Sequence, residues 1–226
     1  MEGNGPPLVL QHGYSDSLES WYEFGYVEPL KSERQVILID ARGHGASDKP
    51  RDASQYTKEL QAADIVAVLQ NLSISRADYW GYSMGGQIGF TMAQYAPDWL
   101  RGLVIGGAAG SGLSRAGDRF LAALEAGGAG AIPALWGVAL PPTLQARLFA
   151  NDVEALKACR ADSPGFATIL STIAKPCLLY AGSADPNCAA AKTAAAKMSN
   201  ATFFTVPGLV HAESDVSQRT RPATHR

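Results

Sequence analysis

The sequence of 226 residues predicts an α/β fold, in which a mostly parallel sheet is flanked by helices. Two observations support this prediction. Short apolar runs rich in β-branched residues alternate with longer segments of helical periodicity, and each run leads directly into a polar or glycine-rich loop. Because ligands of open α/β sheets bind beyond the carboxyl ends of the strands, we expect the functional residues in those loops.

Six apolar runs are predicted to be strands. They are Leu8 to Gln11, Gln35 to Asp40, Ala77 to Gly81, Gly102 to Gly106, Cys177 to Ala181 and Thr202 to Val206. Helices are predicted between them at Glu59 to Leu72, Met84 to Ala96 and Ala189 to Met198. In the first helix, apolar residues recur at intervals of three and are expected to face the sheet. They are Leu60, Ala63, Val66, Leu69 and Leu72.

Residues 107–174 break this rhythm, because they are rich in Ala, Gly and Pro and contain only short helical patches. We expect an inserted helical cap of about four short helices there, on an α/β core formed by residues 1–106 and 175–226. The glycines at 127, 128 and 130 interrupt any long helix. A cap that moves and an ordinary helical excursion fit this composition equally well.

Composition narrows the function classes. Hydrophobic residues make up 46% and charged residues 18% of the chain, with a net charge of -2, which disfavours both disorder and a nucleic-acid-binding surface. Cys159, Cys177 and Cys188 lack metal-ligand spacing and are expected to be reduced thiols. No stretch approaches the roughly 20 apolar residues of a membrane span, and Met1 to Pro7 does not resemble a signal sequence. We therefore expect a soluble, cytoplasmic protein without a metal.

The strongest local motif is Gly81-Tyr82-Ser83-Met84-Gly85-Gly86, between a predicted strand and a predicted helix. A serine at such a sharp turn presents its hydroxyl to solvent, and the glycines two residues away on either side avoid steric clashes. The helix that follows directs its N-terminal NH groups at the same point, where they can stabilise an oxyanion. This context favours Ser83 as a nucleophile over a serine that merely caps the helix.

A serine nucleophile requires a base, and the base requires an acid that orients it. His211 follows the last predicted strand and is the expected base. The other three histidines have different expected places. His12 lies in the loop after the first strand, His44 in a turn, and His225 in an arginine-rich tail.

Asp185 is the expected acid, because it follows the strand Cys177 to Ala181 and gives the chain order Ser, Asp, His. Asp185 could instead cap the helix that begins near Pro186. Asp40 and Asp48 are the rival carboxylates.

The segment His12-Gly13-Tyr14 should lie beside the serine turn if the two strands before them are neighbours. The backbone NH groups of Tyr14 and Met84 are then the expected oxyanion hole, and His12 organises the loop. Trp136 is the expected substrate-binding residue, with Leu135 and Phe120 as further walls of an apolar pocket. Packing of these three side chains between cap and core is an equally good interpretation.

Taken together, these motifs resemble the α/β-hydrolase superfamily, in particular its small esterase, lactonase and cofactor-free haloperoxidase-like branch. The resemblance covers about residues 5–213 and includes Trp21 and the run from Asp40 to Ser47. It implies hydrolysis of small carboxylic esters or lactones through an acyl-enzyme, without metal or organic cofactor. Branches with an aspartate nucleophile are disfavoured by Ser83. Carbon-carbon bond hydrolysis, perhydrolysis and a small-molecule receptor with an idle triad remain alternatives.

Compared with the family pattern, the fold is expected to be shortened at both ends. The chain begins almost directly at the first strand, and residues 213–226 contain Val216 as the only large apolar residue. Gln35 to Asp40 is therefore expected to be an uncovered edge strand, and apolar surface should be exposed elsewhere. From this we expect a homodimer.

Overall fold

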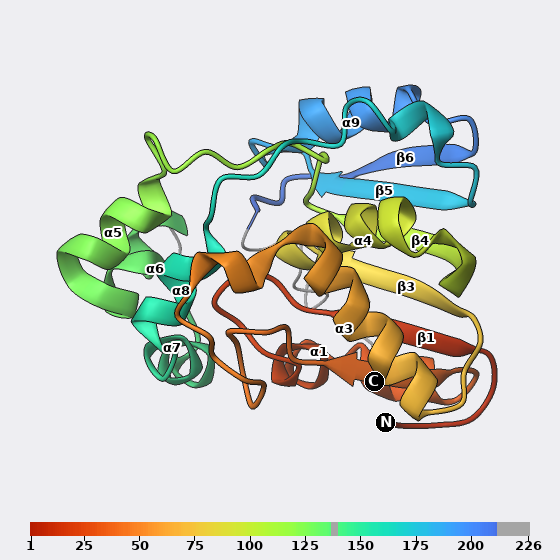
Figure 1. The fold of residues 1–226 in the computed structure, drawn as a ribbon, viewed down its shortest axis with the longest axis horizontal. Helices are drawn as coiled ribbons and strands as arrows, with labels where there is room; N and C mark the ends of the chain where they lie inside the picture. The colour runs from red at the N-terminus through yellow and green to blue at the C-terminus, as the bar shows by residue number, and fades with distance from the viewer. Residues whose placement is uncertain (137–139, 212–226) are drawn as a thin grey trace, which may run out of the picture.

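The structure is a computed structural model that describes residues 1–136 and 140–211, with only the backbone of Trp136. Its centre is a sheet of six strands, all of whose pairings are parallel. The strand order is β2-β1-β3-β4-β5-β6 (Figure 1). All six predicted strands are confirmed, within two residues at each end. They are β1 (Pro7–Gln11), β2 (Gln35–Ile39), β3 (Ala77–Tyr82), β4 (Leu100–Gly106), β5 (Cys177–Gly182) and β6 (Ala201–Val206).

The strand register brings the predicted functional loops together at the carboxyl ends of the strands. β1 lies between β2 and β3, and Gln11 at its end pairs with both Ile39 and Gly81. The loop after β1 and the serine turn after β3 therefore start side by side. Because every pairing is parallel, the loops after β2, β4, β5 and β6 begin at the same end of the sheet, at the carboxyl ends of the strands.

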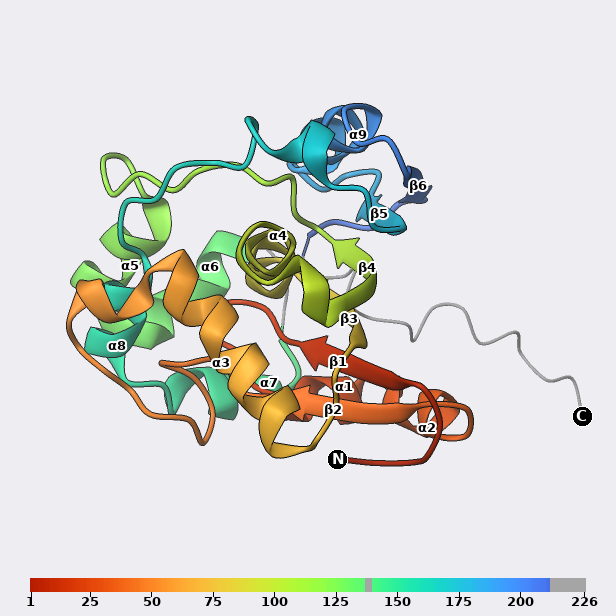
Figure 2. The ribbon, with the colours of Figure 1, turned by 45° about the vertical axis from the view of Figure 1, so that its right-hand side comes forward.

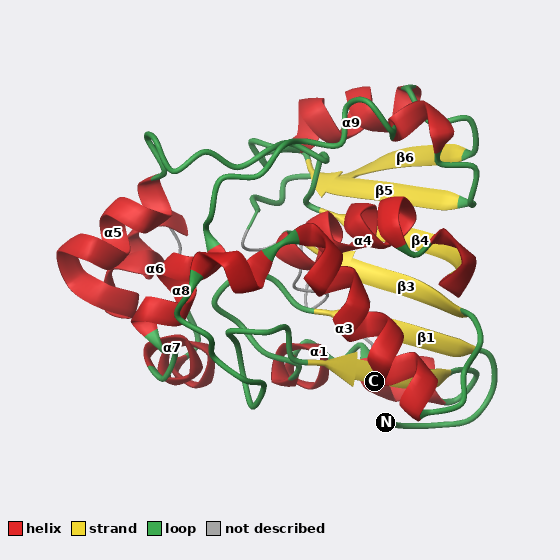
Figure 3. Cartoon of the chain, viewed as in Figure 1, coloured by secondary structure: helices red, strands yellow, loops and turns green. Residues whose placement is uncertain are grey.

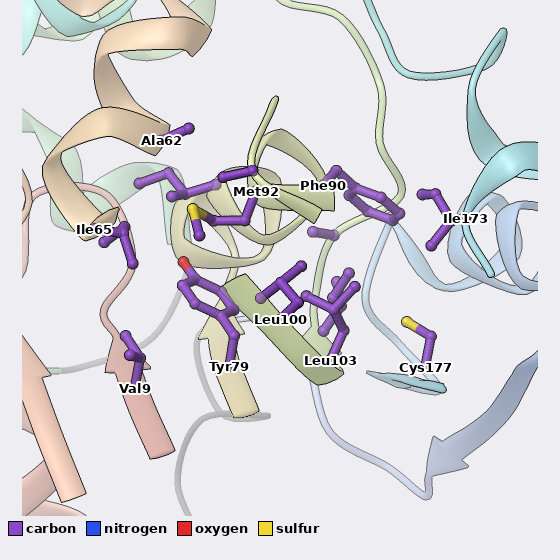
Figure 4. Packing of buried hydrophobic residues seen from close by; sticks show 14 of the residues in the cluster. Val9, Ala62, Ile65, Tyr79, Phe90, Met92, Leu100, Leu103, Ile173 and Cys177 are labelled. Atoms are coloured by element: carbon purple, nitrogen blue, oxygen red, sulfur yellow. The ribbon is translucent and has the colours of Figure 1, made fainter. Parts of the chain in front are cut away.

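Helices cover the two faces of the sheet unequally (Figures 1 and 2). On one face lie α3 (Lys58–Asn71), α4 (Met84–Tyr95) and α9 (Cys188–Ala196), which confirms the three predicted helices. These helices and the strands beneath them form the main hydrophobic core, which contains Val9, Tyr79 and Leu103 (Figure 4). On the other face, α1 (Glu19–Glu23) and α2 (Val27–Lys31) pack on β1 and β2 around the buried Trp21.

The face of α3 that packs on the sheet agrees in part with the predicted one, because Leu69 is buried and Val66 and Leu72 pack against the core. The fully buried residues are Ala62, Ile65 and Leu69, whereas Ala63 is exposed. Residues at a strict interval of three turn by about 300° per step, so they drift around a helix of 3.6 residues per turn. The spacing of three and then four residues in the buried set follows the helix instead.

Within residues 107–174, four α-helices lie in the part that the structure describes. They are α5 (Arg119–Gly127), α6 (Ile132–Trp136), α7 (Pro142–Phe149) and α8 (Val153–Cys159). They gather beyond the carboxyl ends of the strands, on the left of Figure 3. Short 3-10 turns occur within this region at Gly128–Ala131 and Leu170–Thr172, and earlier in the chain at Ala53–Tyr56 and Pro97–Trp99. The helices share a small apolar cluster of their own, formed by Leu124, Ile132, Leu148 and Leu156.

Polar side chains connect these helices to the loop after β1. Arg147 of α7 donates from Nε to Asp16 Oδ1 and from its terminal NH1 group to Glu23, both at 2.8 Å. The Tyr14 hydroxyl donates to the Leu156 carbonyl at 2.9 Å. The position of the helices over the sheet edge is thus set by directional polar contacts as well as by packing.

The strand β2 lies at the edge of the sheet, as expected, but its outer side is paired at one position. Glu2 and Val36 form an antiparallel bridge, with N–H to O distances of 2.9 and 2.8 Å. The segment before β1 therefore satisfies part of the edge that was expected to be uncovered. Among the described residues, no helix is long and apolar enough to span a bilayer.

Candidate active site

The serine turn has the strained backbone that its glycines indicate. Ser83 adopts φ 52° and ψ -109°, and its NH donates to the Gly106 carbonyl at 2.8 Å. A Cβ on Gly81 would lie 2.2 Å from the Gly85 carbonyl oxygen, and one on Gly85 would lie 2.1 Å from the Gln11 carbonyl oxygen. Any side chain at these two positions would force the backbone apart. The turn is therefore possible only with both glycines in place.

The structure brings together the three side chains that the sequence predicts. His211 Nε2 lies 2.9 Å from Ser83 Oγ, and His211 Nδ1 lies 2.7 Å from Asp185 Oδ2. Asp185 is buried, with an exposed fraction of 4%. A hydrogen on Nδ1 donates to the carboxylate and leaves Nε2 as an acceptor for the serine hydroxyl. This is the arrangement that a serine nucleophile and its base require.

Asp185 is not the N-cap of α9, because Asn187 holds that position, but its carboxylate makes a second contact in the turn before the helix. Its second oxygen, Oδ1, accepts a hydrogen bond from the Asn187 NH at 2.7 Å, just before α9 begins. One carboxylate therefore meets both the imidazole and the backbone of the turn before α9. The backbone contact restricts the carboxylate to the orientation that meets His211.

Two residues that the sequence reasoning missed support the base. The Tyr82 hydroxyl donates to the backbone carbonyl of His211. Asn187 Nδ2 donates to the Gly107 carbonyl at 3.0 Å, and a Cβ on Gly107 would lie 3.0 Å from His211 Cε1. Tyr82 stands inside the serine motif, so its proximity to the nucleophile was the available signal. Nothing in the local sequence around Asn187 indicates its partner 80 residues away.

His12 and His44 are buried and act in the framework below the site. His12 Nε2 accepts from the Ala41 NH at 3.0 Å, while Nδ1 lies 2.8 Å from the Gly13 carbonyl, which together define a neutral ring. Burial lowers the pKa of His12, and it lowers the pKa of His44 to about 3. Both residues are structural, in agreement with the sequence interpretation. His225 lies outside the described residues.

The imidazole of His211 meets Asp185 and neither of the rival carboxylates, Asp40 and Asp48. Asp40 accepts the Leu18 NH on Oδ1 and the Ala46 NH on Oδ2, both at 2.8 Å. Its two oxygens thus hold the loops after β1 and β2 together. Asp48 contributes its backbone carbonyl to the Gly43 NH at 2.8 Å.

Two cavities meet at the serine. A small one, of about 80 Å³, is bordered on its apolar side by Phe24, Leu140 and Leu144. A larger one, of about 890 Å³, extends toward α3 and α8. Four residues line both cavities, namely Ser83, His211, Tyr14 and Phe120. An acyl group bound on the serine would therefore have one compartment on each side.

The predicted oxyanion loop lies where it was expected. Tyr14 lines both cavities together with Ser83, and a Cβ on Gly13 would be 3.6 Å from the Ser83 Cβ. Met84 follows Ser83 as the first residue of α4. Of the predicted pocket walls, Leu135 and Phe120 line the large cavity. The side chain of Trp136 lies outside the described part of the structure.

Comparison with known proteins agrees with this geometry. The sequence pattern of the alpha/beta hydrolase fold family matches residues 6–128. A hydrolase from Pseudomonas aeruginosa superposes with a TM-score of 0.83 at 26% identity, covering 96% of this chain and 88% of that one. A second structure, of an N-acyl homoserine lactone degrading enzyme, gives a TM-score of 0.78 at 29% identity, over 96% and 91%.

The 2-hydroxymuconate semialdehyde hydrolase of Pseudomonas sp. strain CF600 is 38% identical over 48% of this chain and 38% of that protein. The matches to the first curated relatives span only 18 to 38% of those proteins' own length. The family model covers more than half of this chain. The chain belongs to the α/β-hydrolase fold family.

Proposed function

We propose that this protein is a serine hydrolase that cleaves small carboxylic esters or lactones through an acyl-enzyme on Ser83. The observation that carries the proposal is the pair of contacts made by His211, at 2.9 Å to the Ser83 hydroxyl and 2.7 Å to the Asp185 carboxylate. No metal or organic cofactor takes part in the proposed reaction.

In the first half of the reaction, His211 accepts the Ser83 proton while the serine oxygen attacks the ester carbonyl. The NH groups of Tyr14 and Met84 stabilise the oxyanion that develops. Asp185 stays ionised and stabilises the imidazolium. His211 then donates its proton to the leaving alkoxide, and the alcohol departs. Water attacks the acyl-enzyme by the same steps and releases the acid.

The two cavities at the serine support small esters and lactones as substrates. The small cavity, walled by Phe24, Leu140 and Leu144, fits a short apolar group on one side of the carbonyl. The large cavity leaves room for the remainder of the substrate. The similarity to an enzyme described as degrading N-acyl homoserine lactones supports the inclusion of lactones.

The test is the hydrolysis of p-nitrophenyl acetate and of a γ-lactone by the wild type and by Ser83→Ala. We expect kcat/KM to fall by a factor on the order of a thousand or more, because removing a triad member removes nucleophilic catalysis. The melting temperature should be retained, since Ala requires no new space. Full activity of Ser83→Ala would contradict the proposal. Ligand-induced thermal stabilisation without turnover in the wild type would favour a receptor.

A further inference from the structure

A second large cavity adjoins the active site and has no role in the reaction proposed above. It measures about 770 Å³ and lies between the loop after β2, the helix α3 and the end of α8. Four residues line both this back cavity and the large active-site cavity, namely Met84, Ile88, Gln61 and Cys159. The two spaces are therefore neighbours that share one wall.

Two sulfur-containing side chains form the part of this wall nearest the nucleophile. Met84 directly follows Ser83, and Cys159 is the last residue of α8. Cys159 Sγ lies 3.9 Å from Met84 Sδ, which is van der Waals contact between a core side chain and a side chain of the helical segment. We propose that this Met84–Cys159 contact sets the acyl-chain preference of the enzyme by closing the back cavity to chains attached at Ser83.

This proposal rests on the proposed function, because it assumes an acyl group on the serine. It further states that the back cavity, once opened, accepts a linear aliphatic chain. The large active-site cavity is bordered by charged residues such as Lys58, Glu59 and Arg119, so a long chain held there remains partly in contact with polar groups. Burial of further CH₂ groups against the aliphatic side chains of the back cavity would raise the affinity for long chains.

Several of the charged residues around the back cavity have partners within the protein. Arg42 donates to both carboxylate oxygens of Asp64 at 2.6 Å, and Lys49 donates to the carbonyls of Gly45 and Ser47. Their charges are thus satisfied within the protein. The remaining lining is largely aliphatic, and it includes Ile39, Ile65, Val68 and Ile88. This surface suits a hydrocarbon chain.

One polar atom in the lining lacks a partner. Gln11 is completely buried, and its Nε2 donates to the Ile39 carbonyl at 3.0 Å. Its Oε1 has no hydrogen-bond partner among the described residues. The substitutions proposed below leave Gln11 unchanged, so the contribution of this atom is the same in every variant.

Cys159 acts in this wall through its size. Burial raises the pKa of its thiol to about 12, so the thiol is neutral at physiological pH. A neutral, buried thiol is a poor nucleophile and packs as a small apolar group. Shortening the side chain by one heavy atom removes its contact with Met84 and opens the wall where the two cavities meet.

The experiment compares p-nitrophenyl butyrate with p-nitrophenyl octanoate in the wild type and in Cys159→Ala. We expect the octanoate-to-butyrate ratio of kcat/KM to rise about tenfold or more, because each buried CH₂ contributes about fourfold. The matched control is Cys188→Ala, which removes a thiol that lines neither cavity and should leave the ratio unchanged. An unchanged ratio in Cys159→Ala would overturn the inference.

A second variant tests the route of the chain. Val68 lines the back cavity and not the large active-site cavity, so Val68→Phe fills the former alone. We expect the double variant Cys159→Ala/Val68→Phe to return to the wild-type ratio. Retention of the raised ratio in a folded double variant would overturn the inference. If the hydrolysis of both esters does not depend on Ser83, the proposed function itself fails. If the hydrolysis depends on Ser83 but the octanoate-to-butyrate ratio is the same in Cys159→Ala as in the wild type, only the inference is contradicted.

Discussion

The sheet side and the helical side of the active site are held in place by different forces. On the sheet side, Ser83, Asp185 and His211 are carried by loops whose starting points are fixed by the parallel strands and their buried core. On the helical side, the described parts of α5 to α8 share a small apolar cluster, against which Tyr14 packs, and they also contact the loop after β1 through polar groups such as Arg147 and the Tyr14 hydroxyl.

This difference separates two tasks of an enzyme. Chemistry requires distances fixed to within a few tenths of an ångström, and a close-packed core with strand register provides that precision. Binding a substrate requires walls that suit its shape, and short helices held by a few directional contacts can change sequence without disturbing the sheet. We therefore expect substitutions on the sheet side to affect turnover and global stability, and those on the helical side to affect KM.

The largest expected effect comes from the buried acid. Asp185→Asn keeps an oxygen for the Asn187 NH but no longer accepts the Nδ1–H of His211 as a carboxylate. We expect kcat to fall by a factor on the order of a thousand to ten thousand, because the imidazole loses its tautomer and its counter-charge. Steady-state kinetics with p-nitrophenyl acetate measure this effect. A loss below tenfold would contradict a role for Asp185 in orienting the base.

The next effect compares two fully buried leucines. Leu179 lies in β5 within the main core, and Leu148 belongs to the four-residue cluster of the helices. Leu179→Ala should lower the free energy of unfolding by about 2 to 5 kcal/mol through lost burial and a cavity. Leu148→Ala should cost less, because the small cluster can collapse around the gap. Urea unfolding measures both, and an equal or larger loss for Leu148→Ala would remove the distinction between the two sides.

Acidification should weaken the sheet side. Burial lowers the pKa of His44 to about 3, so the unfolded chain, with a histidine pKa near 6.5, takes up a proton first. Stability from His44 is complete above about pH 6.5 and falls as the pH drops toward 3. Between pH 7 and pH 5 this amounts to about 2 kcal/mol, and His12 acts in the same direction. Chemical unfolding at several pH values should give a flatter dependence for His44→Asn. If the free energy of unfolding of His44→Asn changed with pH as steeply as that of the wild type, His44 would not be a source of the pH dependence.

The smallest expected effect comes from two arginines that form ion pairs between the helices of the 107–174 region and the rest of the protein. Arg147 is largely buried and meets Asp16, whereas Arg51 is 68% exposed and meets Asp152. Arg147→Met leaves the Asp16 carboxylate unpaired in the wall of the small cavity, and should cost about 1 kcal/mol and raise KM several-fold. Arg51→Met, as the control, should change stability by less than about 0.5 kcal/mol. Equal KM values for both variants would contradict a positioning role of Arg147.

Local sequence patterns were sufficient for the strands and for the triad. Each strand is a short apolar run, and Ser83, Asp185 and His211 follow such runs directly, so parallel pairing places all three at one edge. The buried face of α3 was predicted only in part, because a spacing of three approximates a helix only over two turns. The contact between Arg147 and Asp16 joins residues 131 positions apart. No local periodicity encodes such a contact.

The same limit applies to the shared wall of the two cavities. Met84 was predicted for its backbone NH, and its side chain meets Cys159 only because α8 ends above the start of α4. The orientation of a short helix in the 107–174 region depends on tertiary packing and not on the helix propensities of its residues.

Tyr82 has a mechanical consequence for the reaction. The residue that precedes the nucleophile holds, through its hydroxyl, the main chain of the residue that bears the imidazole. This hydrogen bond ties the backbone of the base directly to the residue before the nucleophile. The separation of the two reacting side chains therefore depends on this one contact as well as on the register of the sheet.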